Sequence, residues 1–354
     1  MLTKVTTTQT EAQHIYVGID VHKKQYQVQI LGEDHNTGPS FSQEACPQIL
    51  INHLQKNYSE ASVHCVYEAG FSGFALYRAL IRAGYECLVV HPADIPTTDK
   101  EKRTKSDKID AKKLAMQLRS NVLTGIHVPS EHTVSFRNLI RVRKRIIRKR
   151  TSCKNQIKHF LFFNGIQRPE EFVGWSKNFM DWLRELPLNY CDRIALDSLL
   201  KLLDTYQETI KDLDRKLVQL SNEAPVKKPI DLLRSVPGVG LTTALVLLSE
   251  IGDMNRFKYE SQLFSYVGLV PHLHASGDTE HVGGITIRGN RWIKGVIIES
   301  AWQAISKDPA LFNCYHRYKK RMNGNKAIVR IGKKLLSRIR CVMRTEQPYQ
   351  MAVN

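Results

Sequence analysis

The chain has 354 residues, 42% of them hydrophobic, which is enough for two or three domains with real cores. No apolar run approaches the roughly 18 residues of a membrane span, and the start of the chain lacks the apolar core of a secretion signal, so we expect a cytoplasmic protein with no membrane partner. The seven cysteines include no CxxC pair, which argues against a disulfide framework and a structural zinc site.

The net charge of +18 is unevenly distributed. Residues 1–130 contain 14 Lys/Arg and 13 Asp/Glu, whereas residues 131–354 contain 38 and 21. Two stretches, 132–169 and 309–345, each carry 11 basic residues and no acid. Such blocks typically contact phosphate backbones, and the alternative is a solvated basic helix face.

The first 130 residues predict an α/β domain. Residues 14–31 contain two extended runs joined at VHKK, and residues 38–45 supply a third short strand. A helix at 47–58, a strand at 63–70, a helix at 73–84, a strand at 86–92 and a helix at 106–120 follow. Three opening strands followed by alternating helices and strands predict a mixed sheet covered by helices, in the order of a ribonuclease-H-like fold.

Residues 131–225 predict two long helices. The first, about 131–165, is basic, and the second carries a leucine stripe between Leu196 and Leu220. Together they predict an antiparallel coiled-coil arm or a dimerisation element, with an ordinary helical core as the alternative.

Residues 226–354 predict a mainly helical domain that opens with a helix-hairpin-helix at 232–252. Its tight turn contains Gly238 and Gly240, whose backbone permits positive φ and leaves amides available to a phosphate. Glycine also serves ordinary helix-to-helix turns, so one copy of the motif is only moderately specific.

Four carboxylates stand where metal-dependent phosphodiester chemistry needs them. Asp20 and Glu68 end two predicted strands, and Asp107 and Asp110 share one face in the first turn of a predicted helix. Two Mg²⁺ ions about 4 Å apart need several hard oxygen ligands to bridge a scissile phosphate. The alternative for each acid alone is helix capping.

A serine, Ser276, lies in the polar segment HASGDT, which we expect to be a loop. Taken alone it is a turn former or a nucleophile. The roles of His272, His274 and His281 stay open.

Six motifs together resemble the insertion-sequence-110 family of transposases, including its 1111 subgroup, over roughly residues 14–345. They are YVGIDVHK, VYEAG, KSDKIDAKKLA, SVPGVGLTTALVLLSEIG, VGLVPHLHASG and GGITIRGNRWIKGVIIESAW. The resemblance implies a RuvC-like DEDD nuclease domain (1–130), a coiled-coil helical region (131–225) and a C-terminal transposase domain with a serine nucleophile (226–354). At the matching positions, Asp20, Glu68, Asp107 and Asp110 hold Mg²⁺, with Mn²⁺ as an alternative, and Ser276 is the nucleophile.

The resemblance also implies donor and target DNA, a noncoding bridge RNA, and a homodimer or homotetramer in which the carboxylates of one subunit meet the serine of another. The expected nucleic-acid contacts are Arg143, Lys144, Arg148, Lys149, Gly238, Gly240, Arg288, Asn290 and Arg291. Two other functions compete with this one. They are a RuvC-like structure-selective nuclease that activates water, and a nucleic-acid-binding protein without catalysis.

Overall fold

The structure is a computed structural model that describes residues 13–33, 37–96, 107–276, 279–286 and 288–351. The chain divides into two compact units, Met1–Val128 and Pro129–Asn354. The finer division of the second unit at residue 225 stays a prediction. Among the residues described, none of the helices combines the length and apolarity needed to cross a membrane.

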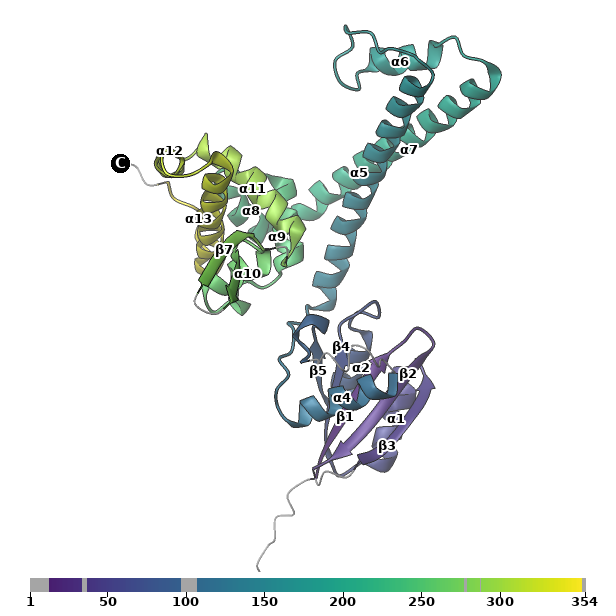
Figure 1. The fold of residues 1–354 in the computed structure, drawn as a ribbon, viewed down its shortest axis with the longest axis vertical. Helices are drawn as coiled ribbons and strands as arrows, with labels where there is room; N and C mark the ends of the chain where they lie inside the picture. The colour runs from purple at the N-terminus through teal and green to yellow at the C-terminus, as the bar shows by residue number, and fades with distance from the viewer. Residues whose placement is uncertain (1–12, 34–36, 97–106, 277–278, 287, 352–354) are drawn as a thin grey trace, which may run out of the picture. The chain divides into compact units, whose positions relative to one another are not determined.

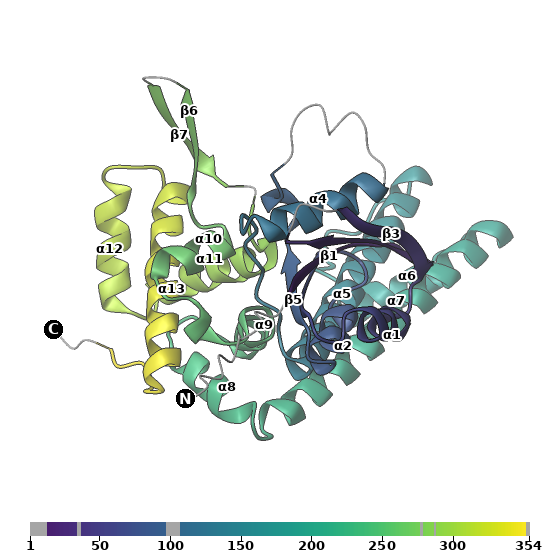
Figure 2. The ribbon, with the colours of Figure 1, turned by 90° about the horizontal axis from the view of Figure 1, so that it is seen from below.

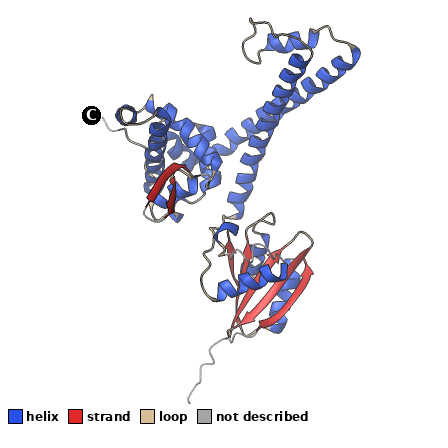
Figure 3. Ribbon diagram, in the orientation of Figure 1, coloured by secondary structure: helices blue, strands red, loops and turns tan. Residues whose placement is uncertain are grey.

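The first unit is built on a five-stranded mixed sheet (Figures 1 and 3). Its strands are β1 (His14–Val21), β2 (Gln25–Gly32), β3 (Thr37–Glu44), β4 (Ser62–Glu68) and β5 (Glu86–Val90), in the order β3-β2-β1-β4-β5. β1 runs antiparallel to β2 and parallel to β4. The predicted mixed sheet is therefore confirmed, and it is consistent with a ribonuclease-H-like fold.

Helices cover both faces of this sheet. Figure 2 shows α4 (Asp107–Arg119) on one face and α1 (Pro47–Asn57) and α2 (Ala75–Arg82) on the other; the short η1 (Pro92–Asp94) follows β5. Side chains alternate along a strand, so Ile15, Val17 and Ile19 fill the core on the side of α1 and α2. Gly18 faces α4, where a Cβ would lie 2.1 Å from the carbonyl oxygen of Ala111. The missing side chain thus lets α4 lie directly on β1.

The second unit begins with α5 (Glu131–Phe163), α6 (Lys177–Glu185) and α7 (Tyr190–Ser221). Ser130 caps α5 by accepting a hydrogen bond from the amide of Thr133 (3.1 Å). α5 and α7 pack against each other, and α6 closes their far end with an apolar cluster that includes Ile157, Phe179 and Leu196 (Figure 1). The two predicted long helices are confirmed, whereas coiled-coil packing stays a prediction.

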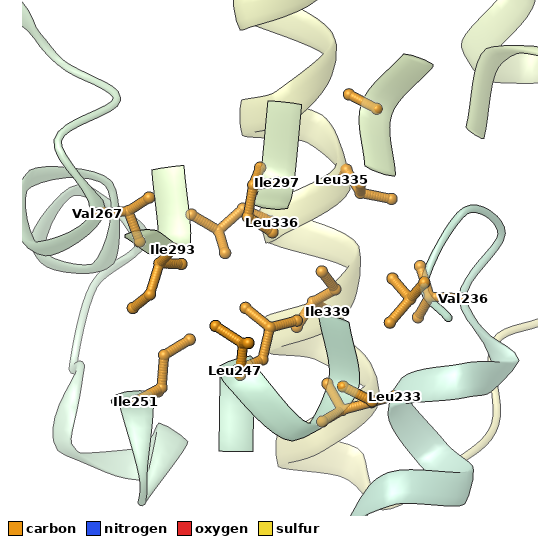
Figure 4. Close-up of a cluster of buried hydrophobic side chains, with 14 of the residues drawn as sticks. Leu233, Val236, Leu247, Ile251, Val267, Ile293, Ile297, Leu335, Leu336 and Ile339 are labelled. Atoms are coloured by element: carbon orange, nitrogen blue, oxygen red, sulfur yellow. The ribbon is translucent and has the colours of Figure 1, made fainter. Parts of the chain in front are cut away.

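The rest of the second unit is a helical core with one β-hairpin (Figure 3). The elements are α8 (Lys227–Ser235), α9 (Leu241–Ile251), η2 (Met254–Arg256), α10 (Glu260–Val267), β6 (Pro271–Ser276), β7 (Thr279–Ile285), α11 (Arg291–Ile305), α12 (Pro309–Lys319) and α13 (Gly324–Thr345). Figure 4 shows Leu335, Leu336 and Ile339 of α13 among side chains from α8, α9 and α11.

A buried carboxylate joins α5 to this core. Glu250, near the end of α9, is 1% exposed, and its two oxygens accept hydrogen bonds from Arg141 of α5 at 2.7 and 2.9 Å. Asn290 donates to the same carboxylate at 2.9 Å, and Tyr266 donates to the backbone carbonyl of Glu250 at 2.8 Å. Arg137 donates to the carbonyls of Ser249 and Glu250. We call these residues the Glu250 cluster. The hydrogen bond to Glu250 raises the pKa of Arg141, so this guanidinium stays charged throughout the ordinary pH range.

We predict that Glu250→Ala lowers the stability of the second unit by about 2–4 kcal/mol, because it leaves the donors of Arg141 and Asn290 without their acceptor. Glu250→Gln should cost less, since an amide oxygen still accepts. All four tryptophans lie in the second unit, so tryptophan fluorescence during urea unfolding reports on it. The exposed Glu299 of α11 provides the control, and Glu299→Ala should change stability by less than about 0.5 kcal/mol. Equal effects of the two alanine variants would contradict the assignment.

Candidate active site

Asp20 and Glu68 occupy equivalent positions on two neighbouring parallel strands. The register pairs Ile19 of β1 with Tyr67 of β4, and both of these side chains are fully buried in the core beneath the sheet. One residue further on, Asp20 and Glu68 therefore project from the same edge of the sheet on the opposite face, the one covered by α4. Strand geometry thus brings these two predicted carboxylates together.

Asp110 joins the same face through α4. It directly precedes Ala111, which lies against Gly18 of β1, two residues before Asp20. Asp107 is the first residue of α4, and its side chain lies outside the described part of the structure. Among the residues described, no three His, Cys, Asp or Glu side chains form a group that could hold a metal ion.

His22 is an additional polar neighbour that the sequence analysis did not single out. Its Nε2 lies 3.0 Å from Oδ2 of Asp20, and its side chain is 41% exposed. The backbone amide of His22 donates to the carbonyl of Gln25 in the turn between β1 and β2. The tight turn after Asp20 therefore places the His22 imidazole within hydrogen-bonding distance of the Asp20 carboxylate.

Ser276 lies at the end of a strand, which differs from the predicted loop. It is the last residue of β6 and pairs with Thr279 of β7, so it stands next to the tip of an antiparallel hairpin. The side chains of residues 272–283, which include Ser276, His272, His274 and His281, lie outside the described part of the structure. Hydrogen bonding between β6 and β7 makes this segment a strand, which its polar sequence alone did not indicate.

The base of this hairpin is a narrow crossing of two backbone segments. The amide of Asn290 donates to the carbonyl of Tyr266 at 2.9 Å, and the amide of Thr286 donates to the carbonyl of Val270 at 2.9 Å. Gly268 and Gly289 have φ of +82° and +99°, and a Cβ on Gly289 would lie 2.6 Å from the amide nitrogen of Gly268. Only glycine fits both the conformation and the space here. Since Tyr266 and Asn290 also bond Glu250, the Glu250 cluster holds the base of the hairpin.

Several predicted nucleic-acid contacts are engaged within the protein. Arg143 forms a two-pronged ion pair with Asp214 of α7, with 3.2 Å between its second nitrogen and Oδ2. The Lys144 ammonium lies 3.9 Å from the ring centre of Trp292, and burial, followed by repulsion from Arg148, lowers the pKa of Lys144 to about 8. These contacts favour a structural role, which the basic sequence did not reveal.

Two more of the predicted nucleic-acid contacts, Asn290 and Gly238, have structural roles. Asn290 caps α11, accepting from the amides of Trp292 and Ile293 at 3.0 and 3.2 Å, besides bonding Glu250. Gly238 has φ of +85°, and a Cβ there would lie 2.3 Å from the carbonyl oxygen of Ser300, so α11 packs against it.

The remaining predicted contacts are open to a ligand. A Cβ on Gly240 would meet no atom within 4 Å. Four basic residues are exposed: Arg148, Lys149, Arg288 and Arg291. We therefore retain these five as the stronger candidates for phosphate contacts.

Glu250 is a further structural residue that was not predicted from the sequence. The sequence feature that could have identified it is an acid inside the apolar segment LVLLSEIG, because a buried charge requires a partner. Nothing in the local pattern identifies that partner as Arg141, more than 100 residues earlier.

Comparisons with known proteins match two stretches of the chain. Residues 17–163 match the profile of the IS110-type DEDD transposase family, and residues 230–317 match that of the IS116/IS110/IS902 transposase family. The "Putative transposase y4qE" of Sinorhizobium fredii is 30% identical over 293 residues, which cover 81% of this chain and 71% of that protein. The transposase for insertion sequence element IS1533 of Leptospira borgpetersenii is 26% identical, over 82% of this chain and 85% of its own.

The "Pilin gene-inverting protein" of Moraxella bovis is 24% identical over 96% of this chain and 98% of its own. The similarity thus extends over both units. Together with the two family matches, it shows that this chain belongs to the IS110 family of insertion-sequence transposases, enzymes that act on DNA.

Proposed function

We propose that this transposase cuts and rejoins DNA with a metal-dependent DEDD site, formed by Asp20, Glu68, Asp107 and Asp110, and a serine nucleophile, Ser276. The observation that carries the proposal is the placement of Asp20 and Glu68 at equivalent positions on β1 and β4, on the face where α4 brings Asp110. A carboxylate pair at the edge of a sheet suits the binding of a phosphate through a hard cation.

The donor set fits Mg²⁺ or Mn²⁺ in chemical kind. Mg²⁺ binds to proteins through one or two carboxylates and completes its shell with water and substrate phosphate oxygens, so a pre-formed group of three protein ligands is not required. A bound cation would neutralise charge on the scissile phosphate. Asp20 and Glu68 would hold it, Asp110 and Asp107 would add oxygens from α4, and His22 would orient the Asp20 carboxylate through their hydrogen bond.

In the proposed reaction, Oγ of Ser276 attacks the scissile phosphorus. A bond from Oγ to phosphorus forms, the bond from phosphorus to the leaving sugar oxygen breaks, and the serine proton passes to that oxygen through solvent or a nearby base. The phosphoserine ester keeps the bond energy, so the hydroxyl of another strand can reverse the step and join DNA. The exposed Arg288 and Arg291, which flank the base of the hairpin, suit the developing negative charge.

We further propose a bridge RNA and a homodimer or homotetramer as partners. The support is the family resemblance together with the large cationic excess of residues 131–354, which suits RNA as well as DNA. The carboxylates and Ser276 belong to different units, so the proposal requires the assembly on nucleic acid to bring them to one phosphate.

Asp20→Ala should reduce strand cleavage at least about hundredfold while nucleic-acid affinity changes little, because a metal ligand is lost but the basic surface is kept. Cleavage of a labelled DNA junction in Mg²⁺, with binding measured in parallel, checks this. Glu60→Ala is the matched control, since this exposed acid precedes β4 at the opposite edge of the sheet. Full cleavage by Asp20→Ala would remove Asp20 from the metal site.

Ser276→Ala should abolish a denaturation-resistant protein–DNA adduct and recombination, while the protein still folds and binds nucleic acid. Electrophoresis of labelled DNA under denaturing conditions detects the adduct, and Thr279→Ala on the facing strand is the control. An adduct formed by the alanine variant would place the nucleophile elsewhere. Efficient cutting by the unaltered protein with no adduct would favour a nuclease that activates water.

Arg148 and Lys149 should contact phosphates, whereas Arg143 should serve the fold. The double change Arg148→Gln and Lys149→Gln should flatten the log-log salt dependence of duplex binding by about 0.9 for each contact and leave stability unchanged. Arg143→Gln should instead lower stability by about 1 kcal/mol through loss of Asp214 and leave the slope unaltered. Fluorescence anisotropy at several salt concentrations measures phosphate contacts, and urea unfolding measures stability, so the two roles are distinguished. An unchanged salt slope in the double variant would mean that α5 is a solvated basic helix.

A further inference from the structure

A row of four aromatic rings lies across α11 and α12 and includes none of the residues to which a functional role is assigned above. The ring centres of Trp302 and Tyr315 are 5.6 Å apart, those of Tyr315 and His316 are 5.6 Å apart, and those of His316 and Phe312 are 4.2 Å apart. The rings are thus in continuous contact from one helix to the next.

Three of these rings face solvent. Trp302 is 42% exposed, Phe312 is 48% exposed and His316 is exposed, whereas Tyr315 is buried beneath them. Phe312 and His316 are four residues apart on α12 and so share one face of that helix. Exposed rings packed on a buried ring form a fixed apolar surface rather than isolated surface side chains.

Cations border this surface. Lys319 ends α12 three residues after His316, Lys320 caps the helix directly after it, and Arg317 is also exposed. Arg330 of α13 stacks its guanidinium 5.5 Å from the ring centre of Tyr318. An acid, Glu299, precedes Trp302 by one turn and is exposed, but residues 309–345 contain none.

The surface is held rigidly. The buried Asp308 caps α12 by accepting from the amide of Leu311 at 3.0 Å, and it also pairs with Arg338 of α13. Tyr349, beyond α13, donates to the same carboxylate at 2.7 Å. Rings on a helix anchored in this way lose little freedom when a ligand stacks on them.

We propose that Trp302, Phe312 and His316 form a stacking site for unpaired bases of a single-stranded nucleic acid, whose phosphates contact Arg317, Lys319 and Lys320. Aromatic faces accept any base, and neighbouring cations follow the backbone, which is how single strands are bound without reading sequence. A duplex offers phosphates but no free base faces, so it contacts only the cations. This site does not depend on the identity of the nucleophile or of the metal ligands.

The test compares full-length variants by fluorescence anisotropy, without divalent metal, on labelled oligo-dT, oligo-U and duplex DNA of about 20 nucleotides. The double change Phe312→Ala and His316→Ala should weaken single-strand binding about tenfold, with little effect on duplex and an unchanged salt slope. The double change Lys319→Gln and Lys320→Gln should weaken binding to all three and flatten their salt dependence. A larger aromatic effect on oligo-U assigns the site to RNA, and a larger effect on oligo-dT assigns it to an unpaired DNA strand.

Phe162→Ala, which removes an exposed ring at the end of α5, is the matched control and should leave single-strand affinity unchanged. The single change Phe312→Trp should leave single-strand affinity equal to that of the unaltered protein, because it keeps an aromatic face at a position exposed enough to accommodate the larger ring. Single-strand affinity unaltered by the aromatic double variant would overturn the proposal, as would an equal loss on duplex DNA. The proposal would also be overturned if the aromatic double variant sedimented differently from the unaltered protein but bound single strands equally well. That result would assign the surface to contact with a second copy of the chain.

Discussion

The buried carboxylate of Glu250 is the interaction on which the second unit depends. A charge with 1% exposure is tolerated only when each oxygen has a partner, and here Arg141 and Asn290 supply those partners from α5 and from the start of α11. The carbonyl of the same residue receives Tyr266 from the end of α10. Three helices therefore take their positions from one residue, and the hairpin that carries Ser276 leaves the core between two of them.

In the first unit, the candidate site residues are positioned by backbone geometry rather than by an ion pair. The register of two parallel strands places Asp20 beside Glu68, and Gly18 lets α4 approach closely enough to carry Asp110 to their face. Backbone geometry alone thus places these side chains on one face of the sheet. The two units position their candidate functional groups by different means, the first by strand register and the second by a central ion pair.

The sequence predicted elements and strand-end acids well because both depend on local pattern: alternation along β1 and β2 marks the strands, and Asp20 and Glu68 follow apolar runs. It could not separate Arg143 and Lys144 from Arg148 and Lys149, because the partners Asp214 and Trp292 lie far along the chain. Local pattern also concealed the strand at Ser276, where order comes from pairing across the hairpin. Gly238 was predicted from its turn, but its contact with Ser300 required the packing of α11.

The crossing of Gly268 and Gly289 has an evolutionary consequence. The hydrogen bond between Tyr266 and Asn290 brings the two ends of the intervening segment side by side, so lengthening that segment adds only a small, logarithmic entropic cost. Changes in the length of this segment therefore need not disturb the helical core, whereas Ser276 itself is held to its proposed role. The helical core therefore constrains where this segment begins and ends, but not how many residues lie between those points.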